Sequence, residues 1–176
     1  MTPTSQTGRY HADHFIVMGV AGSGKSTIAE LLAKRLGYPL VEGDAHHPKA
    51  NIEKMSAGIP LDDDDRKPWL EELGVLMRKS DGPVVLTCSS LKRKYRDILR
   101  QTSGSDILFV YLHGTPELLA ERMNSRTGHF MPPSLLESQL ANLEVPQEDE
   151  NSVQVDIGPA PEVIVDRIMA SLVSGK

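Results

Sequence analysis

The sequence is poor in the features that mark secreted, membrane-bound and nucleic-acid-binding proteins. One cysteine, Cys88, excludes a disulfide within the chain, which fits a reducing compartment. No apolar run approaches the roughly 20 residues that span a bilayer. The 19 lysines and arginines are outnumbered by 24 aspartates and glutamates, a net charge of −5, so no nucleic-acid surface is expected. Residues 1–13 are polar and lack the apolar centre of a secretory signal, so we expect a flexible tail and a cytoplasmic protein.

A glycine-rich octapeptide is the most informative segment present. It fits G-x-x-x-x-G-K-[ST], the phosphate-binding loop, in which Lys25 supplies charge for the β- and γ-phosphates and Ser26 offers a hydroxyl to Mg²⁺. An ordinary glycine-rich turn is the alternative, but an apolar run at 15–18 precedes the motif and a helical pattern follows it. The residues predicted to bind ATP are Gly19, Val20, Ala21, Gly22, Ser23, Gly24, Lys25, Ser26 and Thr27.

Apolar runs alternate with helical patterns along the whole chain. Strands are expected at 15–18, 39–42, 84–88, 107–112 and 153–157, and helices at 69–79, 91–101, 116–124 and 161–173. This alternation predicts one α/β domain, residues 14–176, with a parallel sheet. Ligands of such sheets bind at the carboxyl ends of the strands, so the residues that follow each strand are the candidate site residues.

Polar residues follow the second and third expected strands. Asp44 could accept a proton from an attacking hydroxyl, or it could cap a helix that starts near His47 and Pro48. Ser89 could bind a polyhydroxylated substrate or a magnesium-bound water, and Ser90 could cap the next helix.

Several basic residues could contact phosphate. Lys92 and Arg96 lie four apart on one helix face and could reach phosphate oxygens or remain solvated. Arg122 and Arg126 end a helix and enter a glycine-containing loop, which suits either a mobile lid over the phosphates or favourable charge at a helix end. Arg66 follows four aspartates, 62–65, that could cap the helix at 69, and its guanidinium suits bidentate recognition of a carboxylate.

These segments together resemble the gluconate kinases of the small adenylate-kinase-like and shikimate-kinase-like type. The resemblance is carried by MGVAGSGKS at 18–26, EGDAHHPKANIEKMSAGIPLDDDDRKPWL at 42–70, CSSLKRKYRDILR at 88–100, RMNSRTGHFMP at 122–132 and LLESQLANLEVP at 135–146. It implies a three-layer α/β/α P-loop kinase fold with a five-stranded parallel sheet and a helical lid near 122–133. It also implies ATP:D-gluconate 6-phosphotransferase activity and a homodimer.

The resemblance and the residues lead to one mechanistic hypothesis. Asp44 orients and deprotonates the primary hydroxyl of gluconate, and the phosphoryl charge is neutralised by Lys25, Lys92, Arg122 and Arg126. The substrate-binding residues are expected to be Asp44, His47, Asn51, Lys54, Arg66, Ser89 and Arg126. Two alternatives stay open: a kinase of the same fold for shikimate, a nucleoside monophosphate or another sugar acid, and a regulatory module that binds ATP without transferring phosphate.

Overall fold

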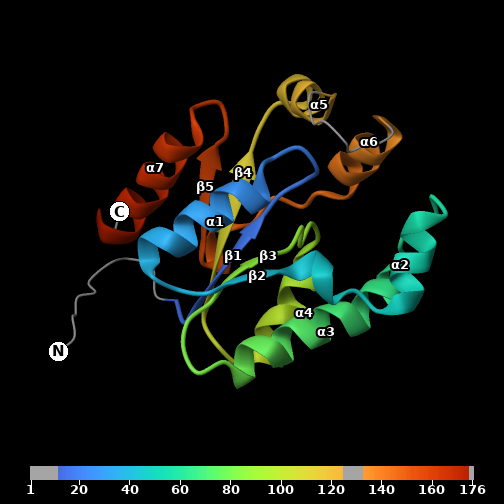
Figure 1. The fold of residues 1–176 in the computed structure, drawn as a ribbon, viewed down its shortest axis with the longest axis horizontal. Helices are drawn as coiled ribbons and strands as arrows, with labels where there is room; N and C mark the ends of the chain where they lie inside the picture. The colour runs from blue at the N-terminus through green and yellow to red at the C-terminus, as the bar shows by residue number, and fades with distance from the viewer. Residues whose placement is uncertain (1–11, 125–132, 175–176) are drawn as a thin grey trace.

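The structure is a computed structural model that describes residues 12–124 and 133–174. One or more helices separate each strand from the next (Figure 1), with η marking 3₁₀ helices. In chain order they are β1 (His14–Met18), α1 (Lys25–Leu36), β2 (Leu40–Glu42), η2 (Gly43–His46), α2 (Lys49–Ser56), α3 (Asp63–Lys79), β3 (Val85–Thr87), α4 (Arg93–Ser103), β4 (Ile107–His113), α5 (Pro116–Asn124), α6 (Pro133–Asn142), η3 (Glu148–Glu150), β5 (Ser152–Asp156) and α7 (Pro161–Ser174).

The five strands form one parallel sheet in the order β2-β3-β1-β4-β5. The central strand β1 pairs with β3 through Phe15 to Val85 and with β4 through Phe15 to Leu108. All five residues of β1 are buried, as expected for a central parallel strand that is covered on both faces. The predicted five-stranded parallel α/β fold is therefore confirmed.

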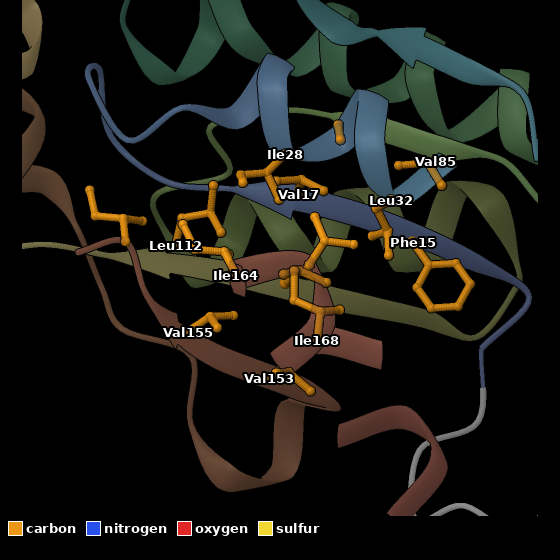
Figure 2. Packing of buried hydrophobic residues seen from close by; sticks show 14 of the residues in the cluster. Phe15, Val17, Ile28, Leu32, Val85, Leu112, Val153, Val155, Ile164 and Ile168 are labelled. Carbon is orange, nitrogen blue, oxygen red and sulfur yellow. The ribbon is translucent and has the colours of Figure 1, made fainter. Parts of the chain in front are cut away.

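Alternate residues of β1 face two separate hydrophobic cores. Phe15 and Val17 pack with residues of α1 and α7, while Ile16 and Met18 pack with residues of α3 and α4. Figure 1 shows α1 and α7 on one side of the sheet and α3 and α4 on the other. Figure 2 shows the first core at close range, with α1 and α7 side chains meeting those of the sheet. The result is a three-layer α/β/α arrangement.

Helix α3 starts six residues earlier than the sequence predicted. Its start is stabilised by a capping box, in which the Asp62 side chain accepts from the Asp65 N–H and the Asp65 side chain accepts from the Asp62 N–H. Pro68 lies inside the helix, and its preference for a helix start made 69 look like the first helical position. The run of aspartates is therefore a helix N-terminus, where negative charge is favourable.

Two further elements complete the described part of the chain. Helix α6 was not among the predicted helices, and α2 starts after Pro48 as its sequence suggested. The described helices include none that is long and apolar enough to cross a membrane. The predicted tail at 1–13 falls almost wholly outside the described residues, so the division into a tail and one domain stays a prediction.

Candidate active site

The phosphate-binding loop connects β1 to α1 and surrounds the N-terminus of that helix. Gly22 and Gly24 have φ of 85° and 86°, which side-chain-bearing residues rarely adopt. A Cβ on Gly22 would also lie 2.8 Å from the Leu119 carbonyl oxygen of α5, so the loop requires glycine there to pack against that helix. Lys25 Nζ donates to the carbonyl of Gly19 at 3.0 Å, which places its charge over the loop.

The predicted metal-binding hydroxyl has a carboxylate partner that sequence reasoning missed. Ser26 Oγ donates to Glu42 Oε1 at 3.0 Å, and Thr87 Oγ1 donates to the same oxygen at 2.8 Å. The Ser26 hydroxyl and the Glu42 carboxylate are both oxygen ligands of the type that Mg²⁺ prefers. This pair of side chains therefore fits the predicted metal. The sequence held one signal for Glu42: it is the last residue of a parallel strand, so it lies at the same carboxyl edge of the sheet as the loop. Thr27 is exposed in the first turn of α1.

Asp44 lies in η2, directly after β2. Its side chain is 85% exposed, and its Oδ1 lies 3.7 Å from His47 Nε2. Interaction with His47, helped by the charge of Lys25, lowers the pKa of Asp44 and keeps the carboxylate ionised at neutral pH. The capping alternative is wrong, because α2 has Pro48 at its N-cap and no side-chain cap. Asp44 is thus an exposed, ionised carboxylate that feels the charge of Lys25 in the phosphate-binding loop.

Three of the predicted substrate ligands have protein partners. The His47 side chain is 5% exposed and stacks on Trp69 with ring centroids 4.0 Å apart. Asn51 is buried and donates to the Asp65 carbonyl at 2.9 Å. Lys54 pairs with the Asp65 carboxylate at 2.7 Å, an interaction that raises the pKa of Lys54. These contacts connect α2 and the residue His47 before it to α3.

Arg66 of α3 and Lys92, at the start of α4, both lie over the ring of Tyr95. Arg66 Nη1 donates to the Tyr95 hydroxyl at 3.0 Å, and its guanidinium lies 5.3 Å from the centre of that ring. The Tyr95 hydroxyl donates to Asp63, which also pairs with Lys94 and lies 3.7 Å from Lys92 Nζ. Lys94 and Tyr95 lower the pKa of Asp63 to about 2. Lys92 is therefore placed with Arg66, the predicted substrate-carboxylate ligand.

Arg96 is neither a phosphate ligand nor a solvated charge, so both predictions for it are wrong. It is fully buried and forms two hydrogen bonds to Glu150, at 2.7 and 3.0 Å. Its Nη1 donates to the carbonyls of Ser90 and Leu91, which fixes the loop after β3. This buried pair positions the half-buried Ser89 at the carboxyl end of the sheet.

The loop after β3 differs from its predicted geometry at Ser90. Ser90 does not cap α4: it adopts a left-handed backbone with φ of 48°, its hydroxyl donates to the Cys88 carbonyl, and the helix starts at Arg93. Burial raises the pKa of the Cys88 thiol to about 12, so it is an inert buried side chain.

Helices α5 and α6 flank the segment expected to form the lid. Arg122 is half-buried in the last turn of α5. Arg126 and most of the lid at 122–133 lie outside the described residues, so both stay predictions. Gln139 of α6 accepts a 2.6 Å hydrogen bond from the Ala21 N–H of the phosphate-binding loop. Sequence reasoning missed this contact, which joins the helix after the expected lid to the loop.

Comparison with known proteins identifies the family. A gluconokinase from Gluconobacter oxydans is 50% identical over 159 residues, which is 88% of each chain. The thermosensitive gluconokinase of Escherichia coli is 48% identical over 149 residues, or 82% of this chain and 79% of that one. The chain belongs to the gluconokinase family. The crystal structure of a gluconokinase from Sinorhizobium meliloti, 52% identical, covers 92% of this chain and 91% of its own, with a TM-score of 0.84.

More distant matches place the gluconokinase family within a broader fold. The shikimate kinase family model matches residues 21–171. The crystal structure of shikimate kinase from Aquifex aeolicus is 19% identical, covers 90% of this chain and 95% of its own, and has a TM-score of 0.58. That likeness shows the fold alone. The resemblance to small gluconate kinases inferred from the sequence is confirmed, whereas the roles of individual site residues stay predictions.

Proposed function

We propose that this protein transfers the γ-phosphoryl group of ATP to the primary hydroxyl of D-gluconate and forms 6-phospho-D-gluconate. One observation carries the proposal: a phosphate-binding loop and an exposed, ionised Asp44 follow strands of the same parallel sheet in a chain of the gluconokinase family. A kinase needs a phosphate site and a base close to each other, and the carboxyl edge of the sheet supplies both.

Different residues at the carboxyl edge of the sheet serve phosphate binding, metal binding and proton transfer in this proposal. The N–H groups of the loop and Lys25 would bind the phosphates, and Ser26, which donates to Glu42, would supply an oxygen ligand to Mg²⁺. Bound Mg²⁺ would neutralise charge on the β- and γ-phosphates. Asp44 takes the proton of the acceptor hydroxyl as its oxygen bonds to phosphorus and the bond to ADP breaks.

The far end of the acceptor is assigned to the group around Tyr95. Gluconate carries a carboxylate at the end opposite its primary hydroxyl, and a planar guanidinium can bind such a group with two parallel hydrogen bonds. Arg66 is held against Tyr95 in a half-buried position, with Lys92 nearby. This arrangement supplies positive charge for the carboxylate, and Ser89 offers a hydroxyl for the sugar chain.

A coupled ADP-release assay tests the proposal. With ATP and Mg²⁺, we expect turnover with D-gluconate and far less with shikimate, nucleoside monophosphates or other sugar acids. Asp44→Asn should lower kcat by roughly 100-fold or more, while Asp81→Asn, an exposed control, should not. Equal turnover with another acceptor would reject the substrate assignment. ATP binding without ADP release in the presence of gluconate would reject the kinase itself.

The oligomeric state and location are separate expectations. The resemblance to small gluconate kinases implies a homodimer, and the composition of the sequence suggested a cytoplasmic location; both stay predictions. Light scattering on the purified protein should give twice the chain mass if the dimer forms.

A further inference from the structure

His47 contacts the proposed base from a position that leaves the ring little freedom. Its ring lies nearly parallel to Trp69, at an interplanar angle of 19°. The Trp69 Nε1–H donates to the Gly43 carbonyl at 2.8 Å, so one α3 residue contacts both the imidazole and the backbone next to Asp44. A Cβ on Gly43 would lie 2.1 Å from the Thr87 carbonyl oxygen, which shows how closely this backbone approaches β3. The peptide that carries the base is thus fixed, as is the ring beside it.

The hydrogen bonds of Asn51 determine which ring nitrogen of His47 carries the proton. The Asp65 carbonyl can only accept, so the Asn51 atom that lies 2.9 Å from it is the amide NH₂ group. The same nitrogen lies 3.2 Å from His47 Nδ1. Because this NH₂ group donates both of its hydrogens, Nδ1 accepts and the proton of the neutral ring is on Nε2. The Nε2–H group faces Asp44 Oδ1 at 3.7 Å.

The Asp44 side chain lacks comparable restraint elsewhere. It is 85% exposed, and the only described contact of its carboxylate that the structure places within ion-pair distance is His47. An exposed carboxylate that samples several rotamers spends less time in line with the acceptor hydroxyl, and misplacement by about 1 Å can cost roughly 100-fold in rate. Hydrogen bonds at catalytic sites are often long without substrate and shorten when it binds.

We propose that His47 is a positioning residue, which orients the Asp44 carboxylate toward the acceptor through an Nε2–H group whose tautomer Asn51 fixes. The inference rests on the proposed function and reassigns His47 and Asn51, which the sequence had suggested as substrate ligands. Their role is to hold the base, and Trp69 provides the surface on which the ring is held.

Two substitutions at His47 separate the N–H group from the packing. His47→Phe keeps the stacking on Trp69 and removes the donor, while His47→Gln places an amide N–H near the original Nε2. We expect the Phe variant to lower kcat about tenfold or more with KM for gluconate within twofold, and the Gln variant to recover most of that loss. His46→Gln is the matched control, because His46 contacts Glu72 instead; its kcat should stay within twofold of wild type.

Each other outcome overturns the inference. If the Phe and Gln variants have equal kcat, the N–H group has no role. If the Phe variant raises KM for gluconate and leaves kcat unchanged, His47 is a substrate ligand. Thermal unfolding of both variants shows whether they are folded, and the kcat comparison is made on the folded fraction. If wild type itself does not use gluconate, the proposed function fails rather than this inference.

A second measurement does not depend on activity. A long-range ¹H–¹⁵N spectrum of the imidazoles, with His47 assigned from the His47→Gln protein, should show a proton on Nε2 and none on Nδ1. Asn51→Asp replaces the donor by a carboxylate, so Nδ1 should become protonated. A wild-type ring already protonated at Nδ1, or a spectrum that Asn51→Asp leaves unchanged, would overturn the proposed role of Asn51.

Discussion

Replacing Glu150 by glutamine should destabilise the protein strongly, although this residue lies outside the proposed reaction centre. Glu150 ends η3 and is 2% exposed. It accepts hydrogen bonds from Arg96 Nε at 2.7 Å, Arg96 Nη2 at 3.0 Å and Arg100 Nη2 at 2.8 Å. Burial alone would raise the pKa of Glu150, but the two arginines outweigh it and lower that pKa to about 2.

Two routes give the size of the effect. A carboxyl that titrates at about 2 when folded and at 4.5 when unfolded contributes about 3 kcal/mol to stability at neutral pH. Removing one partner of a buried ion pair costs about 3–5 kcal/mol, because the other charge is left buried and unpaired. Since 1 kcal/mol shifts Tm by about 2–4 °C in a chain of this size, Glu150→Gln should lower Tm by about 6–20 °C.

Urea unfolding at several pH values measures the effect and its sign. The folded pKa of Glu150 is depressed, so its contribution is fully present above about pH 4.5 and is lost as pH falls toward 2. The stability difference between wild type and Glu150→Gln should therefore shrink below pH 4.5. Glu148→Gln, an exposed change in the same 3₁₀ helix, is the control. A difference under 1 kcal/mol at pH 7, or one that is unchanged at pH 3, would refute the reasoning.

Three further substitutions test the site. Lys25→Ala should reduce kcat for ADP release by roughly 100-fold or more while Tm stays within a few degrees, because the lysine stabilises charge in the transition state; retained turnover would contradict the phosphate-loop assignment. Arg66→Lys should raise KM for gluconate about tenfold in steady-state kinetics, since the bidentate fork is lost; an unchanged KM would place Arg66 elsewhere. Gln139→Leu removes the acceptor of the Ala21 N–H and should therefore raise KM for ATP a few-fold. Glu137→Gln, an exposed change in the same helix, is the control. If the two variants change KM for ATP equally, the Gln139 contact is dispensable.

The strands and the phosphate-binding loop were predictable because their signals are local. A buried parallel strand is a continuous apolar run, so 107–112 in the sequence becomes β4 (Ile107–His113) with one added residue. The loop requires fixed residue types at fixed spacing, and the order of the strands then places Asp44 at the same edge. The start of α3 was harder to predict, because proline is common at a helix start, so Pro68 made a start near 69 more plausible than the capping box at Asp62.

The contacts between distant segments were not predictable from the sequence. Arg96 and Glu150 are 54 positions apart, and the spacing of Arg96 from Lys92 gave the same helix-surface pattern that a solvated pair would give. Gln139 and Ala21 are 118 positions apart. Helical periodicity shows which side chains share a face, but only the packing of α4 against η3 shows that this face is buried.

The partners of each basic residue decide which of them can serve a ligand. Lys54 is paired with Asp65, Lys92 lies near Asp63, and Arg96 is paired with Glu150. Within residues 12–124 and 133–174, Arg66 has no carboxylate partner: its contacts are the neutral hydroxyl and ring of Tyr95. Its charge is therefore held in place without being neutralised. An acceptor carboxylate is the group that such a guanidinium favours, and this physical difference separates Arg66 from basic residues that look equivalent in the sequence.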